Sequence, residues 1–423
     1  MALNSPAWLK SSVIYEIFVR NHSNAGTLNE VLNDLNRIKN LGVDILWFMP
    51  FYPIGKKNRK GNFGSPYAIS DYTEIFSDFG STDQFREIVE RAHELGMKIM
   101  IDIVFNHTAY DSDLYRKNPD YFIKDKNGNP TRKIDDWSDV IDFNFENKEV
   151  WNELKSVLKY WVSIGVDGFR CDVAPLVPIQ FWKESKEMFE DEVIWLAESV
   201  HKSFISHVRK LGYKAYSDPE VQQVFDITYD YDGFEYLQKY FSGKAEIKDY
   251  VNHLFVQETL YPENSIKMRF LENHDNPRAA AVITGKQRLK NWSLFYNIIP
   301  GASLVYAGQE LALDTYPDLF EKNSIRWEKG DYDFYNFFKK VLNISKQIKS
   351  ECDSFSIDEI CKGFYAVKWT GENNYIAFIN LEDRFGKFDC ELNGIYKDMI
   401  SGADIKLGKN CDIPKTPFIF MLK

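Results

Sequence analysis

Two hydrophobic patterns alternate along most of the chain, one typical of amphipathic helices and the other of buried strands. Over residues 28–38, apolar side chains recur every three or four positions, and Gly42 then ends the pattern. The run at 43–49 is apolar except for Asp44, as expected of a strand buried on both faces of a parallel sheet. The same succession recurs with helical patterns at 85–95 and 150–161, glycines at 96 and 165, and strands at 98–104 and 166–172.

Two of the helical patterns begin at residues that can cap a helix. Thr27 and Ser81 stand three residues before Glu30 and Gln84, which is the spacing of a capping box. In a capping box, the two side chains satisfy backbone N–H groups that the first turn of a helix leaves without partners. Both helices are therefore expected to begin at these positions.

Eight segments have the length and hydrophobicity of strands, and helical patterns separate them. They are residues 13–19, 43–49, 98–104, 166–172, 193–197, 224–228, 268–271 and 303–306. This alternation predicts an α/β fold, a (β/α)₈ TIM barrel, and not a doubly wound open sheet. The open sheet would also be expected to carry a glycine-rich phosphate loop, and no G-x-G-x-x-G or G-x-x-x-x-G-K motif is present. No organic cofactor is expected.

Two segments interrupt the alternation and predict how the chain is divided. Residues 107–139, rich in Asp, Asn, Tyr and Pro, form a long excursion after the third strand and predict a short inserted subdomain. After about residue 350, alternating strand patterns are separated by turn signals at 370–374 and 391–394. We therefore predict a catalytic barrel over 1–350 and a small, sandwich-like antiparallel β domain over 351–423.

Composition narrows the classes of partner. The net charge of −10 at pH 7 argues against nucleic acid and anionic membrane surfaces, since no run of Lys and Arg offsets it. A neutral substrate is more natural. Aromatic residues make up 16% of the chain and could stack on sugars, but large cores use them as well. The five cysteines are odd in number and lack C-x-x-C spacing, so they indicate neither a disulfide framework nor a zinc site.

The chain carries no pattern typical of a membrane or secretory segment. The first ten residues lack a basic start followed by an apolar run, and no stretch reaches the roughly 18 apolar residues that a membrane span needs. A cytoplasmic location is the expectation, although a mature secreted form would look the same. The oligomeric state is left open.

The candidate chemistry lies at the carboxyl ends of the predicted strands, where barrel enzymes place their active sites. The strand at 166–172 ends in Arg170 and Asp172, and the guanidinium can hold the carboxylate ionised and oriented. Alone, this pair could be a structural ion pair. Other strand ends, however, add further polar residues, namely Asp102, Asn106, His107, Glu198, His274 and Asp275. A metal-dependent hydrolase would be expected to carry a His-x-His pair, which is missing.

Four motifs at these strand ends resemble the signature regions of the α-amylase superfamily, glycoside hydrolase family 13, in the same order. They are DIVFNH at 102–107, GFRCD at 168–172, LAE at 196–198 and LENHD at 271–275. VIDFN at 140–144 is similar to the family's additional signature, and GSPY at 64–67 to the segment after its second strand. The resemblance covers residues 13 to about 310.

The resemblance implies cleavage of α-glucosidic bonds with retention. Asp172 would be the nucleophile, Glu198 the general acid and base, and Asp275 would bind hydroxyls of the distorted sugar. Such a mechanism needs two carboxyl groups roughly 5–5.5 Å apart, one ionised and one protonated. Arg170 is expected to keep Asp172 charged, and the negative charges of Asp172 and Asp275 to keep Glu198 protonated.

The resemblance also implies residues that surround the substrate and a structural ion. The substrate-binding residues would be Tyr67, His107, Arg170, His274 and Arg278. Asn106 and Asp142 match two ligands of the family's calcium ion, but a further acidic ligand cannot be placed among Asp111, Asp113, Asp135, Asp136 and Asp139. Whether Ca²⁺ is bound therefore stays open.

One departure from the family bears on specificity. Many endo-acting members carry a Lys-His pair just after the nucleophile, and here VAPL follows at 173–176, which weakens the case for long starch chains. The prediction is a retaining hydrolase of α-1,4-linked maltooligosaccharides and starch-derived glucans. A 4-α-glucanotransferase or an α-glucosidase with the same residues is the alternative. An inactive carbohydrate-binding or transporter-associated relative is disfavoured, since Asp172, Glu198 and Asp275 are all present.

Overall fold

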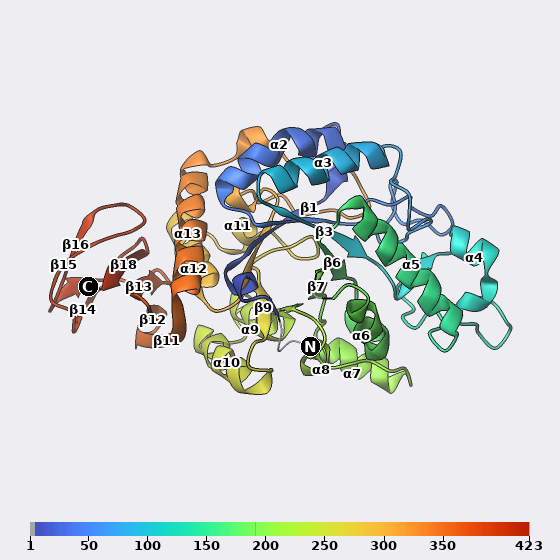
Figure 1. Cartoon of the computed structure of the whole chain (residues 1–423). Coiled ribbons are helices and arrows are strands. Elements are labelled where there is room, and N and C mark those ends of the chain that lie inside the picture. Colours follow the sequence, from blue (N-terminus) through green and yellow to red (C-terminus); the bar gives the residue numbers. More distant parts are fainter. Residues whose placement is uncertain (1–4, 191, 423) are drawn as a thin grey trace.

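Eight parallel strands form a closed barrel in the computed structural model, which describes residues 5–190 and 192–422 (Figure 1). The strands follow one another around the barrel in chain order, with β1 beside β10 where the ring closes. They are β1 Val13–Ile17, β2 Ile45–Phe48, β3 Lys98–Ile103, β6 Gly168–Cys171, β7 Ile194–Ala197, β8 Ile227–Tyr229, β9 Ile266–Arg269 and β10 Ala302–Tyr306. The predicted TIM barrel is confirmed, and each strand lies at or within a few residues of its predicted segment.

Helices surround the barrel, and several of them bury one apolar face. They are α1 Val19–His22, α2 Leu28–Leu41, α3 Thr82–Glu94, α5 Lys148–Ile164, α6 Ile179–Glu187, α7 Lys202–Lys210, α8 Asp218–Gln222, α9 Tyr231–Phe241, α10 Ile247–Leu260, α11 Ala279–Val282, α12 Lys286–Ile298 and α13 Tyr332–Glu351. Short 3₁₀ helices span Ala7–Ser11, Pro119–Tyr121, Ala174–Leu176, Gln309–Leu311 and Trp327–Lys329. Gly42 and Gly165 end α2 and α5 with φ of 107° and 108°, a left-handed conformation that explains the recurrent glycine before each strand.

The two predicted capping boxes differ in the structure. Ser81 forms its box, because its side chain accepts from the Gln84 N–H and the Gln84 side chain accepts from the Ser81 N–H. Thr27 is the N-cap of α2, but its side chain makes no capping bond. The first helical N–H group, on Leu28, instead donates to the carbonyl of Phe79 at 2.8 Å. A backbone carbonyl from another segment thus satisfies one of the N–H groups that the first turn of the helix leaves without partners.

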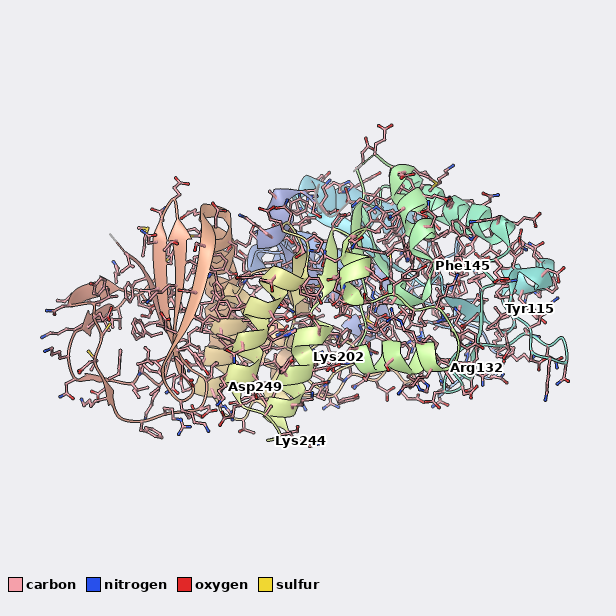
Figure 2. The ribbon with its side chains drawn as sticks, turned by 90° about the horizontal axis from the view of Figure 1, so that it is seen from below. Tyr115, Arg132, Phe145, Lys202, Lys244 and Asp249 are labelled. Atoms are coloured by element: carbon pink, nitrogen blue, oxygen red, sulfur yellow. The ribbon has the colours of Figure 1, made fainter. Side chains whose placement is uncertain are left out.

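The segment inserted between β3 and α5 is closed at its base by a small antiparallel sheet. It contains β4 His107–Ala109, α4 Asp113–Lys117 and β5 Val140–Asp142. β4 pairs with β5, which places His107 opposite Asp142. Figure 2 shows the part of this segment that carries Tyr115 and Arg132 at the end of the molecule opposite the C-terminal strands.

The chain ends in an antiparallel β domain, as predicted. Its strands are β11 Cys352–Cys361, β12 Phe364–Gly371, β13 Asn374–Asn380, β14 Lys387–Phe388, β15 Gly394–Lys397, β16 Asp404–Leu407, β17 Cys411–Asp412 and β18 Phe418–Leu422. A four-stranded sheet runs in the order β11-β12-β13-β18, and β14-β17 and β15-β16 form two smaller sheets. Trp369 attaches the domain to α12 by donating from its indole Nε1 to the carbonyl of Ile298 at 2.8 Å.

A helix that crosses a lipid bilayer must be both long and apolar. Within residues 5–190 and 192–422, none of the helices combines the length and the hydrophobicity needed to cross a membrane.

Candidate active site

A cleft of about 290 Å³ opens at the carboxyl ends of the barrel strands. Its lining combines side chains that follow the strands β6, β7 and β9, side chains of the inserted segment, and side chains of the loops after β2 and β10. These residues are Lys60, Ser65, Tyr67, His107, Trp137, Asp139, Val140, Asp172, Val173, Glu198, His274, Asp275 and Phe320. The predicted catalytic residues Asp172, Glu198 and Asp275 therefore share one cleft with three of the predicted substrate-binding residues, Tyr67, His107 and His274.

Arg170 lies beneath the cleft and links three carboxylates. Its Nη1 donates to Asp172 Oδ1 at 2.8 Å and to both oxygens of Asp102, at 2.9 and 3.0 Å. Its Nη2 lies 3.1 Å from Glu198 Oε2. The guanidinium and Asp102 are fully buried, and Asp172 and Glu198 are nearly so. Because one guanidinium reaches both Asp172 and Glu198, the two carboxyl groups face the same small space, which a retaining mechanism requires.

Three carboxylates around one guanidinium leave the group with an excess of negative charge. Burial and the negative charge of Glu198 raise the pKa of Asp172 well above its ordinary value, although Arg170 opposes the shift. Burial, again opposed by Arg170, raises the pKa of Asp102 to about 7. Arg170 was expected to keep Asp172 charged, but desolvation outweighs the effect of the guanidinium on the pKa of Asp172. A proton is therefore retained within this group at a higher pH than isolated carboxyl groups would allow.

Glu198 is oriented by the backbone that follows the nucleophile. The N–H of Val173 donates to Glu198 Oε2 at 2.7 Å. Val173 has φ 36° and ψ 45°, a left-handed conformation that is strained for a β-branched residue. This conformation turns the N–H toward Glu198. The Val173 N–H thus holds Oε2, which also faces Arg170, so Oε1 is the candidate oxygen for a transferable proton.

His274 connects Asp275 to the inner wall of the barrel. Its Nε2 lies 3.2 Å from Asp275 Oδ2 and 2.8 Å from the hydroxyl of Tyr67, and its Nδ1 hydrogen-bonds to Glu16. Burial alone would lower the pKa of His274, but the charges of Asp275 and Glu16 outweigh it and raise that pKa well above its ordinary value. The imidazolium in turn lowers the pKa of Asp275, against the effect of burial. Asp275 is therefore held ionised at the edge of the cleft.

The inserted segment supplies the wall of the cleft that carries His107. The His107 ring lies against Trp137, with the two ring centroids 5.3 Å apart. Burial and the positive charge of Lys133 lower the pKa of His107 to about 3, so the imidazole is neutral near pH 7. Asp139 is linked across to Lys60 at 3.1 Å. This wall is therefore fixed by packing and by an ion pair to the loop that follows β2.

The structure places Arg278 apart from the other predicted substrate-binding residues. It is buried, and it does not line the cleft. Its Nη1 donates to Glu272 Oε1 at 2.6 Å and its Nη2 to the carbonyl of Ala307 at 2.8 Å. These partners account for much of its hydrogen-bonding capacity, so Arg278 secures the chain after β9 in this conformation.

The residues suggested as calcium ligands are adjacent, but a lysine accompanies them. Lys133 Nζ donates to Asn106 Oδ1 at 2.8 Å and lies 3.5 Å from Asp142 Oδ2. Ca²⁺ requires six to eight oxygen ligands, usually with several carboxylates. Among residues 5–190 and 192–422, no three His, Cys, Asp or Glu side chains are grouped so that they could hold a metal. The set therefore does not suit a divalent cation.

Sequence reasoning did not single out several residues that complete the site. Asp102 was noted at a strand end without a role, and Glu16 lies inside an apolar strand, where only its charge distinguishes it. Lys60 and Trp137 lie in irregular segments, where no periodic pattern exists to show which side chains face the cleft. A carboxylate buried in an apolar strand was a signal that could have identified Glu16, because such a group requires a partner.

Comparison with known proteins relates the whole chain to one family. Residues 16–393 match the family model described as alpha amylase, catalytic domain. The crystal structure of an alpha-amylase from Lactobacillus plantarum is 37% identical, with a TM-score of 0.94 over 99% of this chain and 100% of that chain. A maltogenic alpha-amylase from Thermotoga neapolitana is 32% identical, with a TM-score of 0.87 over 98% of this chain and 100% of that chain. Alpha-amylase 2 of Dictyoglomus thermophilum is 27% identical over 96% of this chain and 75% of that protein.

Proposed function

This chain belongs to the α-amylase family, glycoside hydrolase family 13, and we infer that it hydrolyses the α-1,4 bonds of short maltooligosaccharides with retention of anomeric configuration. The chain is a glycoside hydrolase that acts on α-glucans. The observation that carries the finer assignment is the convergence of Asp172, Glu198 and Asp275 on one cleft above Arg170. The small cleft favours short substrates.

The first chemical step forms a covalent intermediate. An Asp172 carboxylate oxygen attacks the anomeric carbon while Glu198 donates a proton from Oε1 to the glycosidic oxygen, so that the bond to the leaving sugar breaks. The Asp172–Glu198 pair must hold one proton, and the raised pKa of Asp172 shows that this pair retains a proton readily. Productive binding requires this proton on Glu198. Arg170 favours that arrangement, because it donates directly to Asp172 Oδ1.

The second step releases the sugar. Glu198, now ionised, removes a proton from a water molecule, whose oxygen attacks the anomeric carbon and restores the Asp172 carboxylate. Asp275, held ionised by His274, binds hydroxyls of the distorted ring and stabilises the positive charge that develops there. Tyr67 and His107 contact the same sugar from the floor and the side of the cleft.

Substitution of the two catalytic carboxylates tests this assignment. Glu198→Gln should lower kcat by at least about 10²–10⁴-fold, the usual contribution of general acid–base catalysis, and Asp172→Asn should lower it at least as much. Added azide should partly restore turnover of activated glucosides by Glu198→Ala, because azide needs no general base. The matched control is Asp353→Asn, which removes an exposed carboxylate of the C-terminal domain. Full activity in Asp172→Asn or Glu198→Gln would overturn the assignment.

Product analysis distinguishes hydrolysis from its near relatives. Maltotriose to maltoheptaose, starch and isomaltose are incubated with the wild-type enzyme, and glucose and maltose are the expected main products. Products longer than the substrate would instead identify a 4-α-glucanotransferase, which uses the same residues with a sugar as the acceptor. Release of single glucose units from every substrate would identify an α-glucosidase.

A further inference from the structure

Three segments meet at the base of the inserted segment, beside the active-site cleft. Asn106 follows the barrel strand β3, Asp142 ends β5, and Lys133 lies on the irregular stretch that leads into β5. Asn106 and Asp142 are fully buried, and the Lys133 side chain is only 11% exposed. Burying the charge of a lysine costs free energy, which contacts with a carboxylate and an amide can offset. The contacts of Lys133 therefore show how the three segments are held together at this place, which we call the joint.

Lys133 binds the other two residues through both its backbone and its side chain. Its backbone N–H donates to Asp142 Oδ2 at 3.1 Å, and its ammonium lies 3.5 Å from the same oxygen. The ammonium also donates to Asn106 Oδ1 at 2.8 Å. One residue of the inserted segment is therefore tied both to the barrel and to the returning strand.

We propose that the ammonium of Lys133 is the resident cation of this joint and takes the structural place of a calcium ion, so that the enzyme needs no metal here. A Ca²⁺ ion bound to Asn106 Oδ1 would have to share this oxygen with an ammonium 2.8 Å away, and the two cations would repel each other. A single positive charge also matches the single carboxylate of Asp142. This inference goes beyond the proposed function and does not depend on it.

The other acidic side chains of the region are engaged elsewhere or exposed, which supports this proposal. Asp111 accepts from the backbone N–H groups of Lys56 and Lys57, Asp113 pairs with Arg116, and Asp139 pairs with Lys60. Asp135 and Asp136 are exposed. Each of the five therefore has other partners or faces solvent, and no second carboxylate joins Asp142.

The same contact positions a residue of the cleft. Because Asn106 Oδ1 accepts from Lys133, the Asn106 amide nitrogen faces His107 Nδ1, at 3.1 Å. An amide NH₂ group can only donate, so Nδ1 of His107 accepts and its Nε2 carries the hydrogen. Lys133 is in this way a positioning residue for His107, and it fixes the tautomer that can donate a hydrogen bond from Nε2 to a sugar hydroxyl.

Thermal unfolding of the full-length enzyme tests the proposal independently of catalysis. The Tm of the wild type should be unchanged after treatment with EDTA and after subsequent addition of CaCl₂. Lys133→Met keeps an unbranched side chain but leaves Asp142 buried without its counter-charge, and its Tm should fall by several degrees whether or not CaCl₂ is present. The matched control is Lys124→Met, an exposed lysine of the same segment whose partner, Asp120, is 85% exposed. Its Tm should equal that of the wild type.

A second variant, Lys133→Arg, and the tautomer of His107 provide two further tests. If Lys133→Met does not fold, Lys133→Arg retains a positive charge, and its Tm should lie close to that of the wild type. ¹⁵N NMR of the wild type should show His107 protonated at Nε2, and Lys133→Met should show a mixture of tautomers. A wild-type Tm that falls with EDTA and recovers with CaCl₂ would overturn the proposal. So would a Lys133→Met variant that unfolds at the wild-type temperature.

Discussion

Glu16 and His274 hydrogen-bond to each other inside the barrel, although they lie 258 positions apart in the chain. Glu16 is fully buried on β1, and its other oxygen, Oε2, has no hydrogen-bond partner within residues 5–190 and 192–422. A buried carboxylate that is satisfied through only one oxygen is costly, so its value lies in the charge that it presents to His274. We therefore expect Glu16 to act on the substrate through His274 and Asp275.

Glu16→Gln should make the enzyme lose activity at a lower pH on the alkaline side of its pH profile. The folded-state pKa of His274 is raised, so the imidazolium is present below that pKa and is lost as the pH rises through it. Removing the charge of Glu16 lowers this pKa. In the variant His274 loses its proton at a lower pH, and Asp275 loses the cation that holds it ionised and oriented. The alkaline limb of the kcat/KM profile should therefore move to lower pH.

A second buried carboxylate provides the control for Glu16. Glu310 is fully buried, pairs with Arg37 at 2.7 Å, and does not line the cleft. Glu310→Gln should lower the free energy of unfolding without moving either limb of the pH profile. An alkaline limb that stays in place in Glu16→Gln, or that moves equally in Glu310→Gln, would show that Glu16 does not tune His274.

Arg170→Lys should impair both catalysis and folding, although it keeps a positive charge. The guanidinium donates two hydrogen bonds to Asp102 and also contacts Asp172 and Glu198. An ammonium lacks the planar arrangement of donors that these contacts need. We expect kcat to fall by more than about 10²-fold, because Asp172 loses its orientation. The free energy of unfolding should fall by up to about 3–5 kcal/mol, the cost of breaking a buried ion pair.

Kinetics and urea unfolding of Arg170→Lys are compared with those of Arg209→Lys. Arg209 forms an ion pair with Glu220 at 3.4 Å in which both side chains are about half exposed, so the exchange there should change neither quantity measurably. Wild-type kcat in Arg170→Lys would mean that the charge alone matters, and that the bonds to the three carboxylates do not.

The order of the barrel elements was predictable from the sequence because each one is a local pattern. Helical spacing, a glycine and an apolar run are read within about twenty residues, and the packing of Leu35 in α2 and Trp47 in β2 follows from them. The candidate catalytic carboxylates were predictable for a related reason, since Asp172 and Glu198 directly follow such strands. Contacts between distant segments could not be predicted in this way. The contact of Glu16 with His274 depends on how the strands close into a barrel.

Irregular segments set a second limit on prediction. The inserted segment has no period that shows which side chains turn inward, so Lys133 could not be distinguished from the exposed Lys124. Thr27 illustrates the same limit at a helix end, because a carbonyl from Phe79 replaces the expected side-chain cap. Arg278 was assigned by its motif alone, and its burial against Glu272 became apparent only from the three-dimensional arrangement.

Trp369→Ala should loosen the C-terminal domain without affecting the active site. The indole is 5% exposed, contacts Phe355 with ring centroids 5.0 Å apart, and donates to the carbonyl of Ile298 in α12. Truncation of such a side chain costs about 3–5 kcal/mol in the free energy of unfolding. Urea unfolding should show this loss, while kcat at 25 °C stays close to the wild-type value.

The matched control for Trp369 is Phe385, an aromatic residue of the same domain that is 79% exposed. Phe385→Ala removes little buried surface and should leave the urea midpoint unchanged. Equal midpoints for Trp369→Ala and the wild type would mean that the domain is held to the barrel by other contacts, such as those of Arg288 with the carbonyl of Leu381.

The size of the cleft limits the substrate length from which the enzyme can gain rate. At about 290 Å³, the cleft lies at the lower end of the roughly 300–1,000 Å³ typical of small-molecule sites. The wall on the inserted side is short, and Trp137 on this wall is stacked against Phe204, with centroids 6.0 Å apart, so part of its surface is already covered. We therefore expect few sugars beyond the reacting one to be bound on this side.

We expect kcat/KM to rise with chain length only to about maltotetraose or maltopentaose. Binding energy from remote sugars is what lets an endo-acting enzyme gain rate on a long chain, and the backbone at 173–176 offers no Lys-His pair on the leaving-group side. Glucose and maltose should be the main products, and starch should be a poor substrate. The measurement is kcat/KM from maltotriose to maltoheptaose at low conversion. A value that still rises steeply at maltoheptaose would require further subsites, for which the exposed Phe63 and Tyr316 would then be the first residues to substitute.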